Sequence, residues 1–278
     1  TSEYGVPQTR KRIFVIGVKK KYSKLIPKIY ENLINVQKDK NKYTVKDAIS
    51  DLPSLKPGEG RDKVKLLKKN KNNYLKKITN SKFVFNHVAR NHNERDRQRY
   101  KFLSKNNWEL RDLKKIRPDL IHHNPEHFKN RYTVQRYDLP GKTVVSHLYK
   151  DGNLFIHPDH KQERTFTVRE AARVQSFPDN FVFYGGMVSQ YYQIGNAVPP
   201  AISQLFSDIL GDYNIYISTE TVLTLNASEA SYIRPLLNLD TPCATQASFS
   251  ISPYRNPPSR DLPSAGCLVK LTIGPMLL

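Results

Sequence analysis

The chain has 278 residues, enough for one large domain or two modest ones with buried cores. Lys and Arg number 45 against 25 Asp and Glu, so the net charge is +20, and from Tyr213 onward the charges balance. The positive charge therefore lies in residues 1–212 and favours a polyanion, nucleic acid first, although a lysine-rich proteome could produce the same composition. Both cysteines, Cys243 and Cys267, fall in the balanced tail, which argues against a disulfide scaffold.

Two arginines stand immediately before a short apolar run near the start of the chain. Residues 4–12 read YGVPQTRKR, and residues 13–18 read IFVIGV. The run is uninterrupted and rich in β-branched residues, which predicts a strand buried on both faces of its sheet. Arg10 and Arg12 would lie at the entrance of this strand, either as solvated charges or as fixed donors, because a guanidinium stays charged and presents a planar fork.

The next part of the chain is polar and rich in lysine, with one helix predicted at 45–52 and ended by Pro53. Beyond residue 86, the pattern predicts an amphipathic helix with Tyr100 and Leu103 on its buried face. The arginines of this helix are then displayed outward, either to solvent or to phosphate groups: Arg95, Arg97 and Arg99.

Two further signals precede the last third of the chain. His123 and His127 have the spacing of two metal ligands on one helical face, but no Cys or acidic set completes a site, so ordinary histidines and no metal are expected. Residues 131–145 alternate aromatic, β-branched and charged side chains around Pro140 and Gly141, which predicts a strand, a turn and a second strand.

Residues 165–200, TFTVREAARVQSFPDNFVFYGGMVSQYYQIGNAVPP, form the most informative stretch. Thr167 and Glu170 predict a capping box, and Pro178 limits the helix that follows. A final helix is predicted from Pro200 to a stop at Gly211. Its apolar stripe consists of Ile202, Leu205, Phe206, Ile209 and Leu210.

Three blocks together resemble the DNA cytosine-5 methyltransferases. Residues 4–12 match the Gln-x-Arg-x-Arg motif of that family, and REAARVQSFPDNFVFYG followed by QYYQIGNAVPP matches its last two conserved blocks, in order and spacing. The resemblance implies an α/β fold: the C-terminal part of a Rossmann-like methyltransferase domain that uses S-adenosylmethionine, plus a mixed α+β target-recognition domain. The implied segments are 1–45 and 165–212 for the catalytic domain and 46–164 for target recognition.

The family also implies roles for individual residues. Arg12 would hold O2 of a flipped cytosine, and Arg10 would support the acidic group and the DNA backbone. The turn at Asn196, Ala197 and Val198 would line the S-adenosylmethionine pocket, with Ala197 where Ser is also common. Further contacts with DNA are expected from a set of polar residues in the same regions: Gln8, Arg90, Arg131 and Arg136.

The nucleophile of the family lies in Pro-Cys-Gln, its acid in Glu-Asn-Val and its cofactor loop in Phe-x-Gly-x-Gly, and none precedes residues 4–12 here. Glu31 and Cys243 lie in imperfect copies in the wrong order and are not expected to be catalytic. The chain is therefore expected to be one part of a cytosine-5 methyltransferase of a restriction–modification system, inactive without an N-terminal half or subunit. It would act on double-stranded DNA in a prokaryotic cytoplasm and not at a membrane. The alternative is a non-catalytic, sequence-specific DNA-binding remnant.

The tail 213–278 matches no block of the family and is rich in Ser, Thr, Pro and Asn. It is expected to be a poorly ordered extension. A small β-rich module built on segments such as 216–225 is the alternative.

Overall fold

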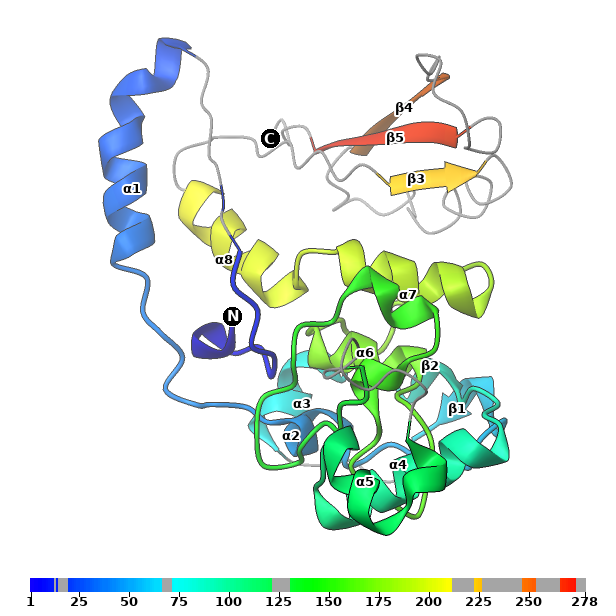
Figure 1. Cartoon of the computed structure of the whole chain (residues 1–278). Coiled ribbons are helices and arrows are strands. Elements are labelled where there is room, and N and C mark those ends of the chain that lie inside the picture. The colour runs from blue at the N-terminus through cyan, green and yellow to red at the C-terminus, as the bar shows by residue number, and fades with distance from the viewer. Residues whose placement is uncertain are drawn as a thin grey trace. The chain divides into compact units, whose positions relative to one another are not determined.

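The computed structural model describes residues 1–12, 14, 20–66, 72–121, 131–211, 223–226, 247–253 and 266–273 (Figure 1). The chain divides into two compact units, one formed by Thr1–Gly17 with Gln37–Ser203 and the other by Val18–Val36 with Gln204–Leu278. The expected strand at 13–18 and the pair His123 and His127 lie outside the described residues, except for Phe14.

The first unit is mainly helical. Its α-helices are α2 (Val45–Ile49), α3 (Asn73–Ile78), α4 (Glu94–Asn106), α5 (Leu113–Ile116), α6 (Val168–Val174), α7 (Met187–Asn196) and the start of α8 (Pro200–Gly211). Its 3-10 helices are η1 (Ser2–Tyr4), η3 (Leu110–Asp112), η4 (Pro118–Leu120), η5 (Ser146–Tyr149) and η6 (Asn153–Phe155). Strands β1 (Gly60–Lys65) and β2 (Phe83–Val88) pair antiparallel.

Helix α6 lies at the centre of this unit, next to α2, β2 and α7 (Figure 1). The capping box is confirmed: Thr167 Oγ1 accepts from the Glu170 amide at 3.2 Å, and a Glu170 carboxylate oxygen accepts from the Thr167 amide at 2.7 Å. Every residue of α6 is buried, including its charged side chains. The helix is therefore an interior element and not the surface helix that its polar residues would suggest.

Two buried arginines of α6 tie its neighbours together. The Arg173 guanidinium donates to Asp179 at 2.8 Å through both Nε and Nη2, and to Asp51 through Nη1. Arg169 donates to the carbonyl oxygens of Phe85 at 2.7 Å, of Pro178 at 3.0 Å and of Phe181. Because a buried charge is tolerated only when it is paired and hydrogen-bonded, these contacts fix the arrangement of α2, β2 and the 178–181 loop around α6.

Two hydrophobic clusters fill the first unit. The larger joins α2, α3, α6 and α7, with Tyr74, Val168 and Tyr191 among its buried side chains. The smaller lies under α4 and α5 and contains Tyr100 and Leu103. Residues 46–164 and 165–203 contribute to the same larger core and lie in one compact unit, and the boundary expected at residue 164 stays a prediction.

Two predictions for the first unit were wrong. Residues 131–145 form no strand–turn–strand; among the described residues they make isolated bridges, such as Val134 with Ile156. Arg99 does not point outward from α4: it is buried and donates to Asp96 at 2.6 Å and to Tyr132 Oη at 3.2 Å. Tyr100 and Leu103 are buried as predicted.

The second unit contains η2 (Lys20–Leu25), α1 (Ile26–Ile34) and the rest of α8. Its strands β3 (Leu223–Asn226), β4 (Ala247–Pro253) and β5 (Gly266–Ile273) form an antiparallel sheet in the order β3-β5-β4. Both interpretations of the tail stay predictions, because most of segment 216–225 and of the rest of the tail lies outside the described residues. The bounds of α8 are those predicted from Pro200 and Gly211.

Candidate active site

The segment that carries Gln8 and Arg10 runs alongside the one that carries Gly141. The Gly141 amide donates to the Pro7 carbonyl and the Thr9 amide donates to the Gly141 carbonyl, both at 2.8 Å. A Cβ at Gly141 would lie 2.9 Å from a Val174 methyl carbon, so glycine allows this segment to pass close to α6. The first block is thereby fixed against the turn at Pro140 and Gly141.

Two buried glutamines link the three sequence blocks. Gln8 Nε2 donates to Gln175 Oε1 at 3.1 Å. Gln175 Nε2 in turn donates to the carbonyl oxygens of Ile194 at 2.6 Å and Ala197 at 2.8 Å. Residues far apart in the chain therefore meet in one network at the end of α7.

The expected contact between Gln8 and DNA does not agree with this position. Gln8 is completely buried, and its Oε1 accepts from the Val144 amide at 3.2 Å while its Nε2 is bound to Gln175. Both ends of the amide are therefore engaged inside the protein, and a contact with DNA would require this network to open.

Arg10 lies in the interior of the site. Its Nη1 donates to the Val144 carbonyl at 2.6 Å and its Nη2 to the Gly195 carbonyl at 3.2 Å. Burial, with a further contribution from the positive charge of Arg12, lowers the pKa of Arg10 to about 10. Within the part of the chain that the structure describes, no carboxylate pairs with Arg10 and its Nε has no hydrogen-bond partner.

Arg12 has the opposite environment. Its side chain is exposed, and its Nη1 donates to the Lys11 carbonyl at 2.7 Å. Two residues along the same extended segment, one arginine is thus used to hold the protein together and the next is presented to solvent.

The end of α7 packs directly against the backbone at residues 145 and 146. A Cβ at Gly195 would lie 2.3 Å from the Ser146 amide nitrogen, so no larger residue fits without a backbone shift. Just beyond this contact, Asn196 and Val198 are exposed and Ala197 is half-buried. The Asn196 carboxamide has no hydrogen-bond partner among the described residues and can bind a polar ligand.

A buried ion pair supports the start of α6. Arg164 donates to both carboxylate oxygens of Glu170 at 2.7 Å, and its remaining donors bind the Leu55 and Thr165 carbonyls and Gln162. Although burial alone would raise the pKa of Glu170, the contacts with Arg164 hold that pKa well below its usual range. Glu170 is therefore a permanently charged structural residue and not a proton donor near neutral pH.

Comparison with known proteins identifies the family. The model of the C-5 cytosine-specific DNA methylase family matches residues 1–210, which include all three blocks. The chain belongs to this family.

Curated relatives are type II methyltransferases. M.Bpa9945I of Bacillus paralicheniformis is 36% identical over 222 residues, covering 76% of this chain and 49% of that protein. M.DdeI of Desulfomicrobium norvegicum is 32% identical over 277 residues, covering 86% of this chain and 59% of that protein. The chain thus spans about half the length of the curated relatives that it matches.

A solved structure shares the fold of this methylase-family chain. It is assigned as a DNA modification methyltransferase encoded within a prophage of E. coli, and it superposes with a TM-score of 0.51 at 24% identity, covering 77% of this chain and 57% of that chain. The expected α/β methyltransferase fold is supported at this level.

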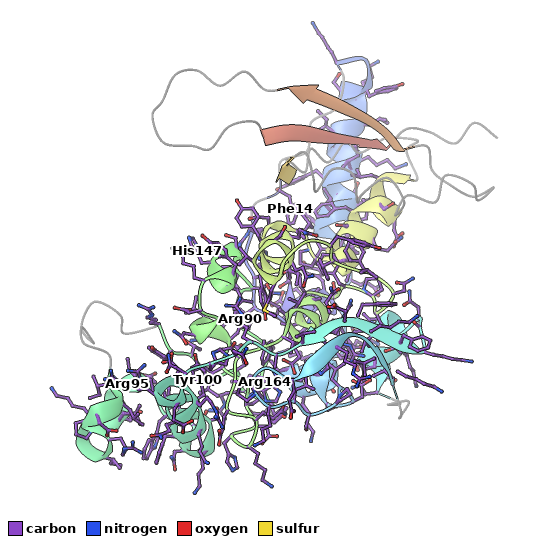
Figure 2. All side chains as sticks on the ribbon, turned by 90° about the vertical axis from the view of Figure 1, so that its right-hand side faces the viewer. Phe14, Arg90, Arg95, Tyr100, His147 and Arg164 are labelled. Carbon is purple, nitrogen blue, oxygen red and sulfur yellow. The ribbon has the colours of Figure 1, made fainter. Side chains whose placement is uncertain are left out.

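Arg90, expected to contact DNA in this methylase-family chain, is largely committed to the protein. Its Nη2 donates to the Leu148 carbonyl at 2.7 Å, and its guanidinium lies 4.2 Å from the centre of the Tyr191 ring. In Figure 2 Arg90 lies below the segment of His147, well away from Arg95. Arg90 thus joins η5 to α7, and only part of its guanidinium is accessible.

Arg131 and Arg136 lie nearer the surface. Arg131 pairs with Asp151 at 2.9 Å, and Arg136 donates to both carboxylate oxygens of Asp138 at 3.1 and 3.0 Å. Since exposed ion pairs are worth less than about 1 kcal/mol, either arginine could exchange its carboxylate for a phosphate.

The sequence did not indicate that Gln175, Arg164 and Glu170 together stabilise the site. For Glu170 and Gln175 the signal is a run of polar residues inside a stretch whose apolar residues already predict burial, REAARVQ, whereas Arg164 lies ahead of this run. Among the described residues no group of three His, Cys, Asp or Glu could hold a metal ion, and none of the helices is long and apolar enough to cross a membrane.

Proposed function

We propose that residues 1–210 form the C-terminal part of a DNA (cytosine-5-)-methyltransferase of a restriction–modification system. The complete enzyme would transfer methyl from S-adenosylmethionine to C5 of a cytosine flipped out of duplex DNA. Residues 46–164 would recognise the target sequence, and the network around Gln175 would hold the reactive end of the site. The match of residues 1–210 to the family and the type II methyltransferase relatives support this proposal.

The observation that carries the proposal is the uncompensated charge of Arg10. A buried guanidinium without a carboxylate is unfavourable, because desolvation costs several kcal/mol and two carbonyl oxygens repay only part of it. A carboxylate from outside the described residues would complete the pairing. The glutamate that protonates N3 in the cytosine-5 chemistry would supply such a carboxylate. The family carries this glutamate in Glu-Asn-Val, and that motif does not precede Gln8 in this sequence.

Arg12 and the turn after α7 have the exposure that the reaction requires. The exposed Arg12 guanidinium has donors beyond the Nη1 that binds the Lys11 carbonyl, which suits O2 of the flipped base. Asn196, Ala197 and Val198 would contact S-adenosylmethionine, with the Asn196 carboxamide as the polar contact. When bound, S-adenosylmethionine supplies the methyl group. The cysteine nucleophile would come from the missing part, since no Pro-Cys-Gln is present in the chain.

A chimera tests the proposal. The N-terminal half of M.Bpa9945I is joined to residues 1–210 in place of its own C-terminal half, because this relative is 36% identical to the chain over the region they share. We expect 5-methylcytosine in the DNA of cells that express the chimera. The intact relative is the positive control, and its N-terminal half alone and the present chain alone are the negative controls.

The same experiment distinguishes the proposed methyltransferase from the alternative, a non-catalytic DNA-binding remnant. A folded chimera that binds duplex DNA and leaves cytosine unmethylated would favour the remnant. Methylation by residues 1–278 alone would contradict the division of the site between two parts.

A further inference from the structure

Strand β1 carries three cations on one side of the β1–β2 ribbon. Arg61, Lys63 and Lys65 alternate along the strand, so their side chains share one face. In the antiparallel register Lys63 lies opposite Phe85 and Lys65 opposite Phe83. All three cations are exposed. On the other face Val84 is fully buried, so the face that carries the exposed Lys63 and Lys65 is the outer one. Arg61 is itself exposed, although its cross-strand partner His87 is buried.

These cations differ from the arginines of α4. Arg97 pairs with Glu163 at 2.8 Å and Arg99 with Asp96 at 2.6 Å, so the charge of both arginines is neutralised by carboxylates of the protein. Arg61, Lys63 and Lys65 have no ion pair or hydrogen bond with any residue that the structure describes. Their charge is therefore available to an external anion.

The phenylalanines of β2 orient the central cation. Lys63 Nζ lies 4.5 Å from the centre of the Phe83 ring and 5.9 Å from that of Phe85. Cation–π contacts of this kind stabilise an ammonium group by about 0.5–1 kcal/mol at exposed sites without using its three N–H donors. Lys63 is thus held over the ribbon with its donors free.

The ribbon is rigidly connected to the central helix of the site. Arg169 of α6 donates to the Phe85 carbonyl at 2.7 Å. The Asn86 side chain donates to the Phe183 carbonyl at 2.9 Å and accepts from the Phe183 amide at 3.0 Å. A ligand on the outer face of the ribbon is therefore held in a fixed position relative to α6, which leads into Gln175.

We propose that the outer face of the β1–β2 ribbon binds the sugar–phosphate backbone of duplex DNA, independently of base sequence. Alternate residues of a strand are about 6.6 Å apart, so Arg61, Lys63 and Lys65 span about 13 Å. Duplex DNA carries one charge per ~1.7 Å of axis, which gives each cation its own phosphate. The proposal rests on the proposed function for its choice of DNA over other polyanions.

The test compares two triple variants of the full chain that lose the same charge. In the ribbon variant Arg61→Gln, Lys63→Gln and Lys65→Gln are combined. In the control variant, three exposed lysines on α2, α4 and α5 are changed: Lys46→Gln, Lys105→Gln and Lys114→Gln. Binding to a short fluorescein-labelled duplex is measured by anisotropy between about 50 and 200 mM salt, with thermal melting as a check of folding.

Each phosphate contact contributes about 0.9 to the slope of log K against log salt, so the ribbon variant should flatten that slope by about 2.7. The control variant should change it much less. Equal changes in both variants would mean that the protein binds through diffuse charge, and an unchanged slope in the ribbon variant would mean that the ribbon does not touch DNA. Either result overturns the proposal.

Single substitutions at Lys63 add a second readout. Lys63→Met should flatten the slope by about 0.9, and Lys63→Arg should preserve it, because Arg keeps both the charge and the cation–π contact. Loss of the slope with Lys63→Arg would also overturn the proposal. These measurements need only the chain itself, so their failure is distinguishable from a chimera that fails to methylate.

Discussion

At the scale of single residues, burial separates the two arginines of the first block. Arg10 binds two carbonyl oxygens in the interior, and Arg12 faces solvent two residues later. Sequence spacing places both at the same point of the chain, but only their environment assigns one to holding the site together and leaves the other for a ligand.

Arg12→Ala should depress turnover by the chimera about a hundredfold to a thousandfold, since a donor aimed at charge that develops in the transition state contributes roughly 3–4 kcal/mol. Affinity for duplex DNA should change little, because one contact among many phosphates is lost. Arg12→Lys should rescue only partly, as an ammonium lacks the planar fork. Single-turnover methylation and anisotropy measure the two effects. A loss of affinity with intact methylation would assign Arg12 to the DNA backbone.

Glu170→Gln should destabilise the first unit by about 3–5 kcal/mol, because it leaves Arg164 buried and unpaired. Urea unfolding at neutral pH measures the effect. Asp138→Asn is the matched control: it removes an exposed pair with Arg136 and should cost less than about 1 kcal/mol. A small loss at Glu170 would mean that Arg164 finds other acceptors.

At the scale of elements, sequence signals that act over a few residues correctly predicted the ends of helices. The capping box of Thr167 and Glu170 and the bounds Pro200–Gly211 of α8 were correct, because caps and terminal Pro and Gly act within a few residues.

Failures of prediction follow from partners that are distant in sequence. Alternation over 131–145 predicted two paired strands, but the segment instead bridges to residues near Gln8 and Ile156. Arg99 was predicted to face outward because α4 is polar, yet it donates to the Leu120 carbonyl and to Tyr132 Oη, 21 and 33 residues further along the chain. The contact of Gln8 with DNA stays a prediction, and the partner that Gln8 has in the protein, Gln175, lies 167 residues away.

Gly195→Ala tests the packing of α7 on the backbone at Ser146. The new methyl group would lie 2.3 Å from the Ser146 amide nitrogen and must displace backbone, so we expect a loss of about 1–3 kcal/mol. Gly186→Ala, at the start of the same helix, meets nothing within 4 Å and should cost at most about 1 kcal/mol. Thermal unfolding compares the two, and equal losses would contradict the close approach.

At the scale of the whole molecule, the buried His87 and the half-buried His92 make stability depend on pH. Burial lowers the pKa of His92 to about 4, with a contribution from Arg90, and burial also lowers the pKa of His87. Below its ordinary pKa near 6.5, each histidine binds protons more readily in the unfolded chain than in the folded one. The free energy of unfolding should therefore fall as pH decreases from about 6.5 towards 4.

Urea midpoints measured between these pH values check this prediction. His92→Gln should make the decline shallower, whereas His147→Gln, which changes an exposed side chain, serves as the control. If His92→Gln left the decline in the free energy of unfolding unchanged, the decline would originate in other titratable groups. Below the ordinary pKa of glutamate, near 4.3, protonation of the unfolded chain at Glu170 adds a further loss, because its folded pKa is depressed.

The two acceptors of Arg10 have a consequence for synthesis on the ribosome. The Val144 and Gly195 carbonyls lie 134 and 185 residues further along the chain. At 5–20 residues per second, the second acceptor is made roughly 10–40 s after Arg10. During that interval the guanidinium remains solvated, and the first block stays open to chaperones and proteases. The site closes only after the end of α7 leaves the exit tunnel, so a ribosome that stalls before Gly195 yields a chain whose first block has no final position.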